Sequence, residues 1–343
     1  MMFRKPALQT AAPAPVQADP GAQKKSGLAL AGAALFFVTA AAALLAARGN
    51  PYDGAPVVRV HVSGAPAAPA AAAASAKGAA AATVGALPPA PIAGLTAPGP
   101  GGLLPIIASD GRASWQAYAR PFADDGRPKI ALVIGGLGLN ADMTRQAIAN
   151  LPPEVTLSFS PYAESLQELI DQARLAGHEV MIEIPMEPLD YPDTDPGPYT
   201  LTTSAQAGEI GHRMDWLMSR ATGYFAVTNA FGARFLTQEK PMAAFNQVLR
   251  QRGVAFVDDG QAANRGGGVR RASAAVHIDA DLDSAAIDKQ LLALEAQALQ
   301  SGGAVGTGAG YPLTVSQVQH WATAVRDRGY VLAPASALMA LRP

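Results

Sequence analysis

KIALVIGGLG, residues 129–138, begins with one lysine and continues as an uninterrupted apolar run that ends in a cluster of glycines. Such a run is typical of a strand buried on both faces of a parallel sheet. Seven similar short runs follow, mostly separated by stretches of helical spacing: VTLSF at 155–159, EVMIEI at 179–184, YFAVTN at 224–229, VAFVDD at 254–259, AAVHID at 274–279, GAVGT at 303–307 and YVLAP at 330–334. This alternation predicts an α/β domain over residues 129–343, with a parallel sheet that is either open or closed as a (β/α) barrel.

The composition excludes several classes of protein. The 26 lysines and arginines are balanced by 27 aspartates and glutamates, whereas a nucleic-acid-binding protein usually carries a basic excess. Because the chain has no cysteine, disulfide scaffolds, cysteine zinc sites and thiol catalysis are also excluded. Charged residues make up only 15% of the chain, against about 25% in an ordinary soluble domain, so some segments must be very poor in charge.

Residues 27–47 form the first of these segments, a run of 21 residues with no charge and no proline. As a helix of about 31 Å it would cross a bilayer core, so we expect a single transmembrane helix. The preceding tail, residues 1–26, holds Arg4, Lys5, Lys24 and Lys25, and this positive charge predicts a cytoplasmic N-terminus. The C-terminal domain would then lie in the periplasm of a bacterial inner-membrane protein; a cleaved signal peptide is the alternative.

The segment between this helix and the domain is rich in alanine and proline. We expect residues 48–102 to be a flexible linker, because small apolar residues bury too little area to offset the entropy cost of ordering. Residues 103–128 contain Trp115, Tyr118 and Phe122, and these aromatic residues predict a lead-in arm that packs on the domain.

Candidate functional residues follow the predicted strands, since the site of a parallel α/β sheet lies at the carboxyl ends of its strands. The carboxylates there are candidates for a general acid and base or for holding a hard cation; the alternative is that they form structural ion pairs and caps. They are Glu183, Glu187, Asp258 and Asp259. Polar and aromatic residues nearby are candidates for recognising a substrate: Asn229, Arg234, Tyr162, Tyr191 and Tyr199. The three tyrosines would either stack on a ligand or anchor loops.

Three further patterns carry less information. The glycines at 135, 136 and 138 lack the lysine and the serine or threonine of a phosphate-binding loop, so we interpret them as a tight turn. Of the five histidines, only His277 is a candidate for the carboxyl end of a strand. Asp279, Asp281 and Asp283 lack the glycine of a calcium loop and are interpreted as the approach to a helix.

The order of the motifs from about residue 128 to residue 343 resembles the divergent polysaccharide deacetylase family, a branch of the NodB-type carbohydrate esterases. The matching blocks are KIALVIGGLG, GHEVMIEIPMEP at 177–188, GPYTLTT at 197–203, VTNAFGARF at 227–235, FVDDG at 256–260 and, more loosely, AVGTGAGYP at 304–312. The resemblance implies a distorted (β/α) barrel that binds a divalent metal through an aspartate and two histidines. The metal would activate water to attack an N-acetyl group.

At the matching positions, however, the family's reactive residues are replaced. An aspartate pair corresponds to Gly135 and Gly136, two histidines to Glu183 and Ala230, and a later histidine to Thr307. We therefore expect no metal and no cofactor, with a divalent cation on the remaining carboxylates as the alternative. The hypothesis is a catalytically degenerate, membrane-anchored domain that binds an envelope glycan or an envelope protein. The alternative is an active deacetylase or hydrolase with a rebuilt carboxylate site.

Overall fold

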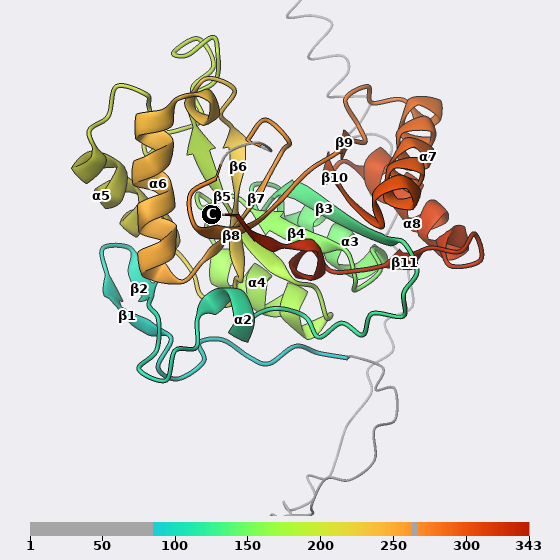
Figure 1. Cartoon of the computed structure of the whole chain (residues 1–343), viewed down its shortest axis with the longest axis horizontal. Helices are drawn as coiled ribbons and strands as arrows, with labels where there is room; N and C mark the ends of the chain where they lie inside the picture. The colour runs from blue at the N-terminus through green and yellow to red at the C-terminus, as the bar shows by residue number, and fades with distance from the viewer. Residues whose placement is uncertain (1–84, 263–265, 343) are drawn as a thin grey trace, which may run out of the picture. The chain divides into compact units, whose positions relative to one another are not determined.

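The computed structural model describes residues 85–262 and 266–342 (Figure 1). The predicted cytoplasmic tail, the predicted transmembrane helix and the first part of the predicted linker lie outside this range. In the range that is described, no helix combines the length and the apolar character needed to cross a bilayer.

One ten-stranded sheet forms the centre of the domain. Its strands are β3 (Lys129–Leu137), β4 (Thr156–Phe159), β5 (Val180–Met186), β6 (Ala226–Phe231), β7 (Ala255–Asp258), β8 (Val269–Ser273), β9 (Val276–His277), β10 (Gly303–Ala309), β11 (Val331–Leu332) and β12 (Ala340–Arg342). Their spatial order is β12-β8-β7-β6-β5-β4-β3-β10-β9, and β11 also pairs with β3. Every pairing is parallel except β12 with β8.

The predicted parallel α/β sheet is therefore confirmed, but its strands do not close into a full barrel. Over the described residues, the hydrogen-bonded path runs from β12 to β9 and does not return to its start. The result is an open half-barrel.

Helices connect the strands and cover one face of the sheet. The main helices are α3 (Ala141–Asn150), α4 (Leu166–Leu175), α5 (Ala207–Met218), α6 (Glu239–Arg252), α7 (Ser284–Ser301) and α8 (Pro312–Val325). Figure 1 shows α5 and α6 side by side at one end of the sheet and α7 and α8 at the other. Local sequence sets the ends of some of them: the side chain of Asn140 accepts hydrogen bonds from the first turn of α3, and Gly253 ends α6 in a left-handed conformation.

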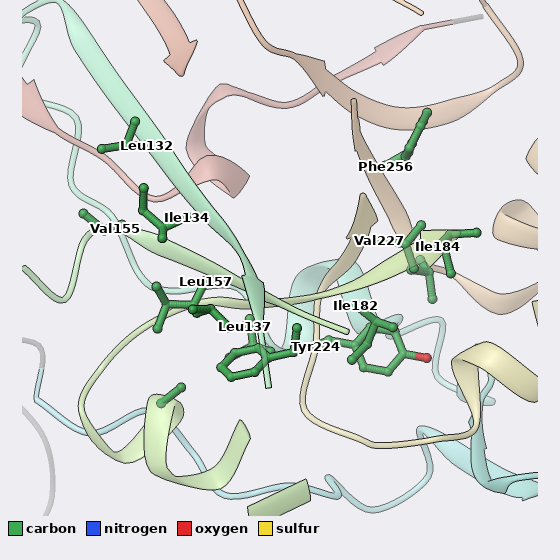
Figure 2. Close-up of a cluster of buried hydrophobic side chains, with 14 of the residues drawn as sticks. Leu132, Ile134, Leu137, Val155, Leu157, Ile182, Ile184, Tyr224, Val227 and Phe256 are labelled. Carbon is green, nitrogen blue, oxygen red and sulfur yellow. The ribbon is translucent and has the colours of Figure 1, made fainter. Parts of the chain in front are cut away.

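Alternation along the strands divides the buried side chains between two clusters. On β3, Ile130, Leu132 and Ile134 belong to the large cluster under the helices, whereas Ala131 and Val133 belong to a smaller cluster on the opposite face. Figure 2 shows part of the large cluster, where strands β3 to β7 contribute most of the labelled side chains. Full burial of each such aliphatic or aromatic side chain contributes about 1.5–3 kcal/mol.

The opposite face of the sheet is covered by the segment before β3, and here the predicted linker boundary is wrong. Residues 85–102 are part of the folded domain: β1 (Thr96–Gly99) pairs with β2 (Gly102–Pro105), and Leu95 is fully buried in the smaller cluster. A Cβ on Gly102 would stand 2.7 Å from the carbonyl oxygen of Ser219, so only glycine allows this close approach. The composition of residues 85–102 is dominated by alanine, proline and glycine, so it gave no sign of these few anchoring residues.

The lead-in arm, residues 103–128, packs on the domain as its aromatic residues predicted. Tyr118 is buried in the smaller cluster, and the backbone N–H of Arg120 donates to Glu179 Oε1 at 2.7 Å. The other carboxylate oxygen of Glu179 accepts from the backbone N–H of Ser336 at 3.2 Å, in the short helix η2 (Ala335–Leu338). One buried carboxylate thus joins the arm, the start of β5 and the segment after β11.

Candidate functional site

A cavity of about 610 Å³ opens at the carboxyl ends of the strands, at the edge where parallel strands were expected to place a site. Residues from β3, β4, β5, β6, β9 and β10 line it, together with the loop after β7. The lining contains the backbone of Gly135 and Gly136 and the side chains of Ser158, Glu183, Thr228, Asn229, Phe231, Asp259, Gln261, His277 and Thr307. Of the four predicted carboxylates, only Glu183 and Asp259 are in this lining.

Glu183 projects from β5 toward the end of β3. Its Oε1 atom accepts a hydrogen bond from the backbone N–H of Gly136 at 2.6 Å and from the hydroxyl of Ser158 at 2.8 Å. Burial raises the pKa of the Glu183 carboxyl, although both hydrogen bonds oppose this shift because they favour the charged form. The wall of the cavity therefore carries a carboxyl group whose pKa is raised.

The space that Glu183 fills is the space above Gly135. A Cβ added to Gly135 would lie 2.8 Å from Glu183 Oε1 and 2.6 Å from Ser158 Oγ. No side chain fits at position 135 while Glu183 keeps this conformation. The carboxylate that the family resemblance implies at the end of the first strand is thus absent there, and a carboxylate from the third predicted strand stands in its place.

On β9, on β10 and just after β9, a histidine, a threonine and an aspartate form a chain of polar contacts. The Nδ1 atom of His277 lies 3.1 Å from Thr307 Oγ1, and its Nε2 atom lies 3.3 Å from Asp279 Oδ1. Asp279 is buried and fixed, because its Oδ2 accepts from the backbone N–H of Ala309 and from the hydroxyl of Thr314, both at 2.8 Å. A carboxylate on one ring nitrogen and a hydroxyl on the other suit an imidazole that accepts and returns a proton.

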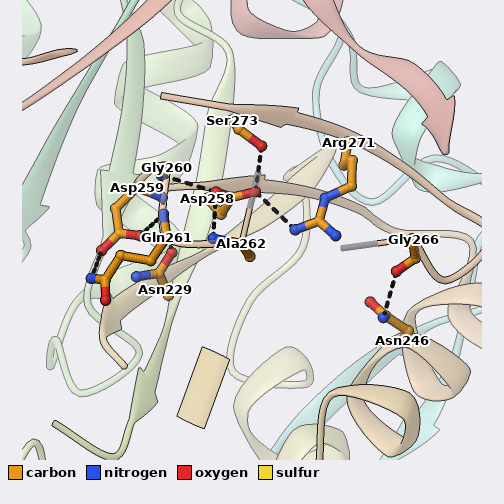
Figure 3. Close-up of polar contacts among 10 residues, drawn as sticks. All are labelled: Asn229, Asn246, Asp258, Asp259, Gly260, Gln261, Ala262, Gly266, Arg271 and Ser273. Atoms are coloured by element: carbon orange, nitrogen blue, oxygen red, sulfur yellow. Dashed lines mark hydrogen bonds and ion pairs between the residues drawn. The ribbon is translucent and has the colours of Figure 1, made fainter. Parts of the chain in front are cut away.

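Asn229 shapes the rim of the cavity between β6 and β7. Its side-chain nitrogen donates to the carbonyl oxygen of Phe231 at 2.5 Å, and its oxygen accepts from the backbone N–H of Asp259 at 3.2 Å. Asp259 in turn accepts from the side-chain nitrogen of Gln261 at 2.8 Å, as Figure 3 shows. Asn229, predicted to bind substrate, is therefore held by two backbone contacts and positions its neighbours.

Two predicted catalytic candidates, Glu187 and Asp258, lie outside the cavity lining. The buried Asp258 accepts from Arg271 Nη2 and from the hydroxyl of Ser273, both at 2.8 Å (Figure 3). Glu187 is also buried, and its Oε1 atom accepts from Arg234 Nη1 at 3.1 Å. In this structure both carboxylates and Arg234 form structural ion pairs, which was the alternative that the sequence left open.

The three predicted stacking tyrosines are also outside the cavity lining. Tyr199 stacks on Trp216 with ring centroids 3.7 Å apart, and Tyr162 lies 6.2 Å from the same ring. The Tyr162 hydroxyl accepts from the backbone N–H of Tyr199 at 3.1 Å, so this cluster anchors the proline-rich loop to α5. Tyr191 is partly buried within that loop.

The side chains of the cavity do not fit a divalent metal ion. The implied ligand positions Gly135, Gly136 and Ala230 have no side-chain donor atoms, and Glu183 already accepts two hydrogen bonds on one oxygen. Within residues 85–262 and 266–342, no three histidine, aspartate or glutamate side chains gather where they could hold an ion.

Sequence reasoning missed Phe231, Asp279 and the contribution of His277. A signal existed for His277, because it stands at the end of a short apolar run with Asp279 two residues later. No sequence signal marked Phe231, because strand alternation assigns it to the face of Val227, in the core under the helices.

Comparison with known proteins agrees with this architecture. The model of the divergent polysaccharide deacetylase family matches residues 132–339, more than half of the chain. The chain is 24% identical to the uncharacterised protein YibQ of Escherichia coli K12 over 198 residues, which are 56% of this chain and 61% of YibQ. It thus spans less than two thirds of that relative's length.

Solved structures with related folds include the uncharacterised protein ATU2773 of Agrobacterium tumefaciens C58. It is 34% identical, with a TM-score of 0.67 that covers 69% of this chain and 99% of that one. The catalytic domain of peptidoglycan N-acetylglucosamine deacetylase from Eubacterium rectale is 13% identical, with a TM-score of 0.41 over 64% of this chain and 95% of that one. On the family match over residues 132–339, the chain belongs to the divergent polysaccharide deacetylase family.

Proposed function

We propose that the cavity binds an N-acetylated envelope glycan and that the chain has lost the metal-dependent hydrolysis implied by its family resemblance. The observation that carries this proposal is the position of the Glu183 carboxylate, which occupies the space above Gly135. A ligand set cannot be rebuilt there without displacing Glu183.

The shape and lining of the cavity support a sugar ligand. Its volume of about 610 Å³ lies within the usual range for small-molecule sites. The wall contains hydroxyl, amide, imidazole and carboxyl groups, and such groups can hydrogen-bond the hydroxyls and the acetamido group of a hexosamine. The family membership points to the same class of ligand.

Calorimetric titration of the full chain in detergent with N-acetylglucosamine oligomers tests this proposal. We expect saturable binding that EDTA leaves unchanged and that the deacetylated oligomer does not reproduce, with no release of acetate. Acetate release that EDTA abolishes and zinc restores would contradict the proposal. Glu187→Gln, outside the cavity lining, is the matched control for Glu183→Gln, which should weaken binding.

The proposed location is the periplasmic side of a bacterial inner membrane, with residues 27–47 as the anchor. The support is the uncharged 21-residue run and the positive charge before it. Fusions of alkaline phosphatase after residue 60 should be active in a bacterial host, and fusions after residue 25 should be inactive. Release of the chain from membranes by alkaline carbonate would contradict the anchor.

The contacts of His277 favour a second candidate function, the removal of an acyl group without a metal. In this reaction water attacks the acyl carbon and its proton passes through the Thr307 hydroxyl to Nδ1 of His277, and the same route returns the proton to the leaving amine as the carbon–nitrogen bond breaks. Asp279 would stabilise the imidazolium ion. Acetate release in EDTA that His277→Ala abolishes would support it. An unchanged rate in His277→Ala would refute it.

A further inference from the structure

Phe231 combines two unusual properties at the rim of the cavity. The residue is 55% exposed although it is a large aromatic residue, and its backbone has φ of 60°. In the described part of the chain, it is the only non-glycine residue with positive φ. Bulky residues avoid this left-handed region because of steric strain.

Specific contacts hold Phe231 in this conformation. The side chain of Asn229 donates to its carbonyl oxygen at 2.5 Å, and Gly232 follows with φ of 105°. A regular strand would place residue 231 on the same face as Val227, which is fully buried in the core under the helices. The left-handed backbone turns the chain at this point, and Phe231 lines the cavity instead.

We propose that Phe231 is a stacking platform for a pyranose ring and sets the specificity of the cavity for hexosamine glycans; this inference rests on the proposed function. The C–H face of a pyranose is apolar and weakly positive, and it packs on the negative face of an aromatic ring. Hydroxyl groups around the edge of the same sugar would meet the polar side chains of Asp259 and Gln261, which line the same cavity.

The strain itself supports a binding role. An exposed phenyl ring at this position gains little from burial, so burial of the side chain itself does not offset the strain. Strained residues of this kind concentrate at functional sites, where the strained conformation takes part in ligand binding. A ligand that covers the ring would supply the missing apolar burial.

This reasoning predicts effects of opposite sign on stability and binding, measured on the full chain in detergent. Phe231→Gly and Phe231→Asn should raise the Tm by about 2–4 °C, because glycine and asparagine tolerate positive φ. Both should weaken binding of an N-acetylglucosamine oligomer about tenfold, because the ring is lost. Phe231→Trp should retain binding and show no rise in Tm.

Leu189→Gly is the matched control. Leu189 is 66% exposed, lies outside the cavity lining and has no positive φ, so this variant should leave the affinity unchanged and should not raise the Tm.

The outcomes separate this inference from the proposed function. If Phe231→Gly binds the oligomer as the unsubstituted chain does, while Gln261→Ala binds more weakly, the platform is wrong and glycan binding stands. If the unsubstituted chain binds no oligomer, both are wrong. A Tm that falls in both Phe231→Gly and Phe231→Asn overturns the strain argument.

Discussion

Gly135→Ala should destabilise the domain, although alanine usually favours folding over glycine where φ is ordinary. Replacing glycine by alanine would by itself stabilise the folded state by about 0.4–1 kcal/mol, because alanine lowers the conformational entropy of the unfolded chain. In this structure the new methyl group would lie 2.6 Å from Ser158 Oγ and 2.8 Å from Glu183 Oε1, so at least one side chain must move.

The contacts around Glu183 set the magnitude. Overpacking costs about 1–3 kcal/mol, and displacing the carboxylate also loses hydrogen bonds to a charged group, worth about 1.5–3 kcal/mol each. With one of these hydrogen bonds lost and the gain from alanine subtracted, we expect a net loss of about 2–5 kcal/mol in the free energy of unfolding. Urea unfolding followed by circular dichroism measures this loss.

A double-mutant cycle gives the sharper test. In a Glu183→Ala background the carboxylate is gone and Ser158 is free to rotate, so Gly135→Ala should cost at least about 1 kcal/mol less than in the unsubstituted chain. Gly136→Ala is the control, because a Cβ there meets nothing within 4 Å, and its cost should stem from its φ of 70° in either background. If Gly135→Ala lowers the free energy of unfolding equally in both backgrounds, the Glu183 carboxylate does not occupy the space above Gly135.

Three other predictions concern stability. Burial raises the pKa of Glu179 to about 7 from 4.5, so the folded chain binds this proton more tightly than the unfolded chain does. The free energy of unfolding should therefore fall by about 3 kcal/mol as pH rises from 4.5 through 7. Glu179→Gln should flatten this pH dependence in urea titrations. Asp258→Ala removes the carboxylate that pairs with the buried Arg271 guanidinium and should lower the free energy of unfolding by about 3–5 kcal/mol. The loss should appear as a lower urea midpoint, and an unchanged midpoint would contradict the buried pair. Gly102→Ala forces a methyl group against the Ser219 carbonyl and should speed proteolysis near β2 without changing glycan affinity.

Much of the fold could be predicted from the sequence because strand burial is a local property. Apolar runs such as 129–134 can be recognised without their partners, and parallel strands place their carboxyl ends at one edge whichever way the sheet closes. Leu87 and Leu95 in an alanine- and proline-rich stretch escaped notice, because two anchoring residues do not change the composition of a segment.

The candidate site was less predictable because it depends on partners far apart in sequence. Asp258 is tied to Arg271, and Asp279 is tied to Thr314, 35 residues away. Whether a carboxylate is free or paired cannot be known before such contacts exist. The left-handed backbone of Phe231 is equally hidden, because phenylalanine is a residue that normally disfavours it.

The contacts of Glu179 also impose an order of events on biosynthesis. Ser336 is made 157 residues after the carboxylate that it binds, and Ala335 is made 179 residues after its partner Thr156. Contacts this distant in sequence slow folding, because the loop between them must close first. The ribosome will therefore expose the nascent β4 and β5 before their last partner exists, and a chaperone that holds these strands during synthesis should raise the yield of folded protein.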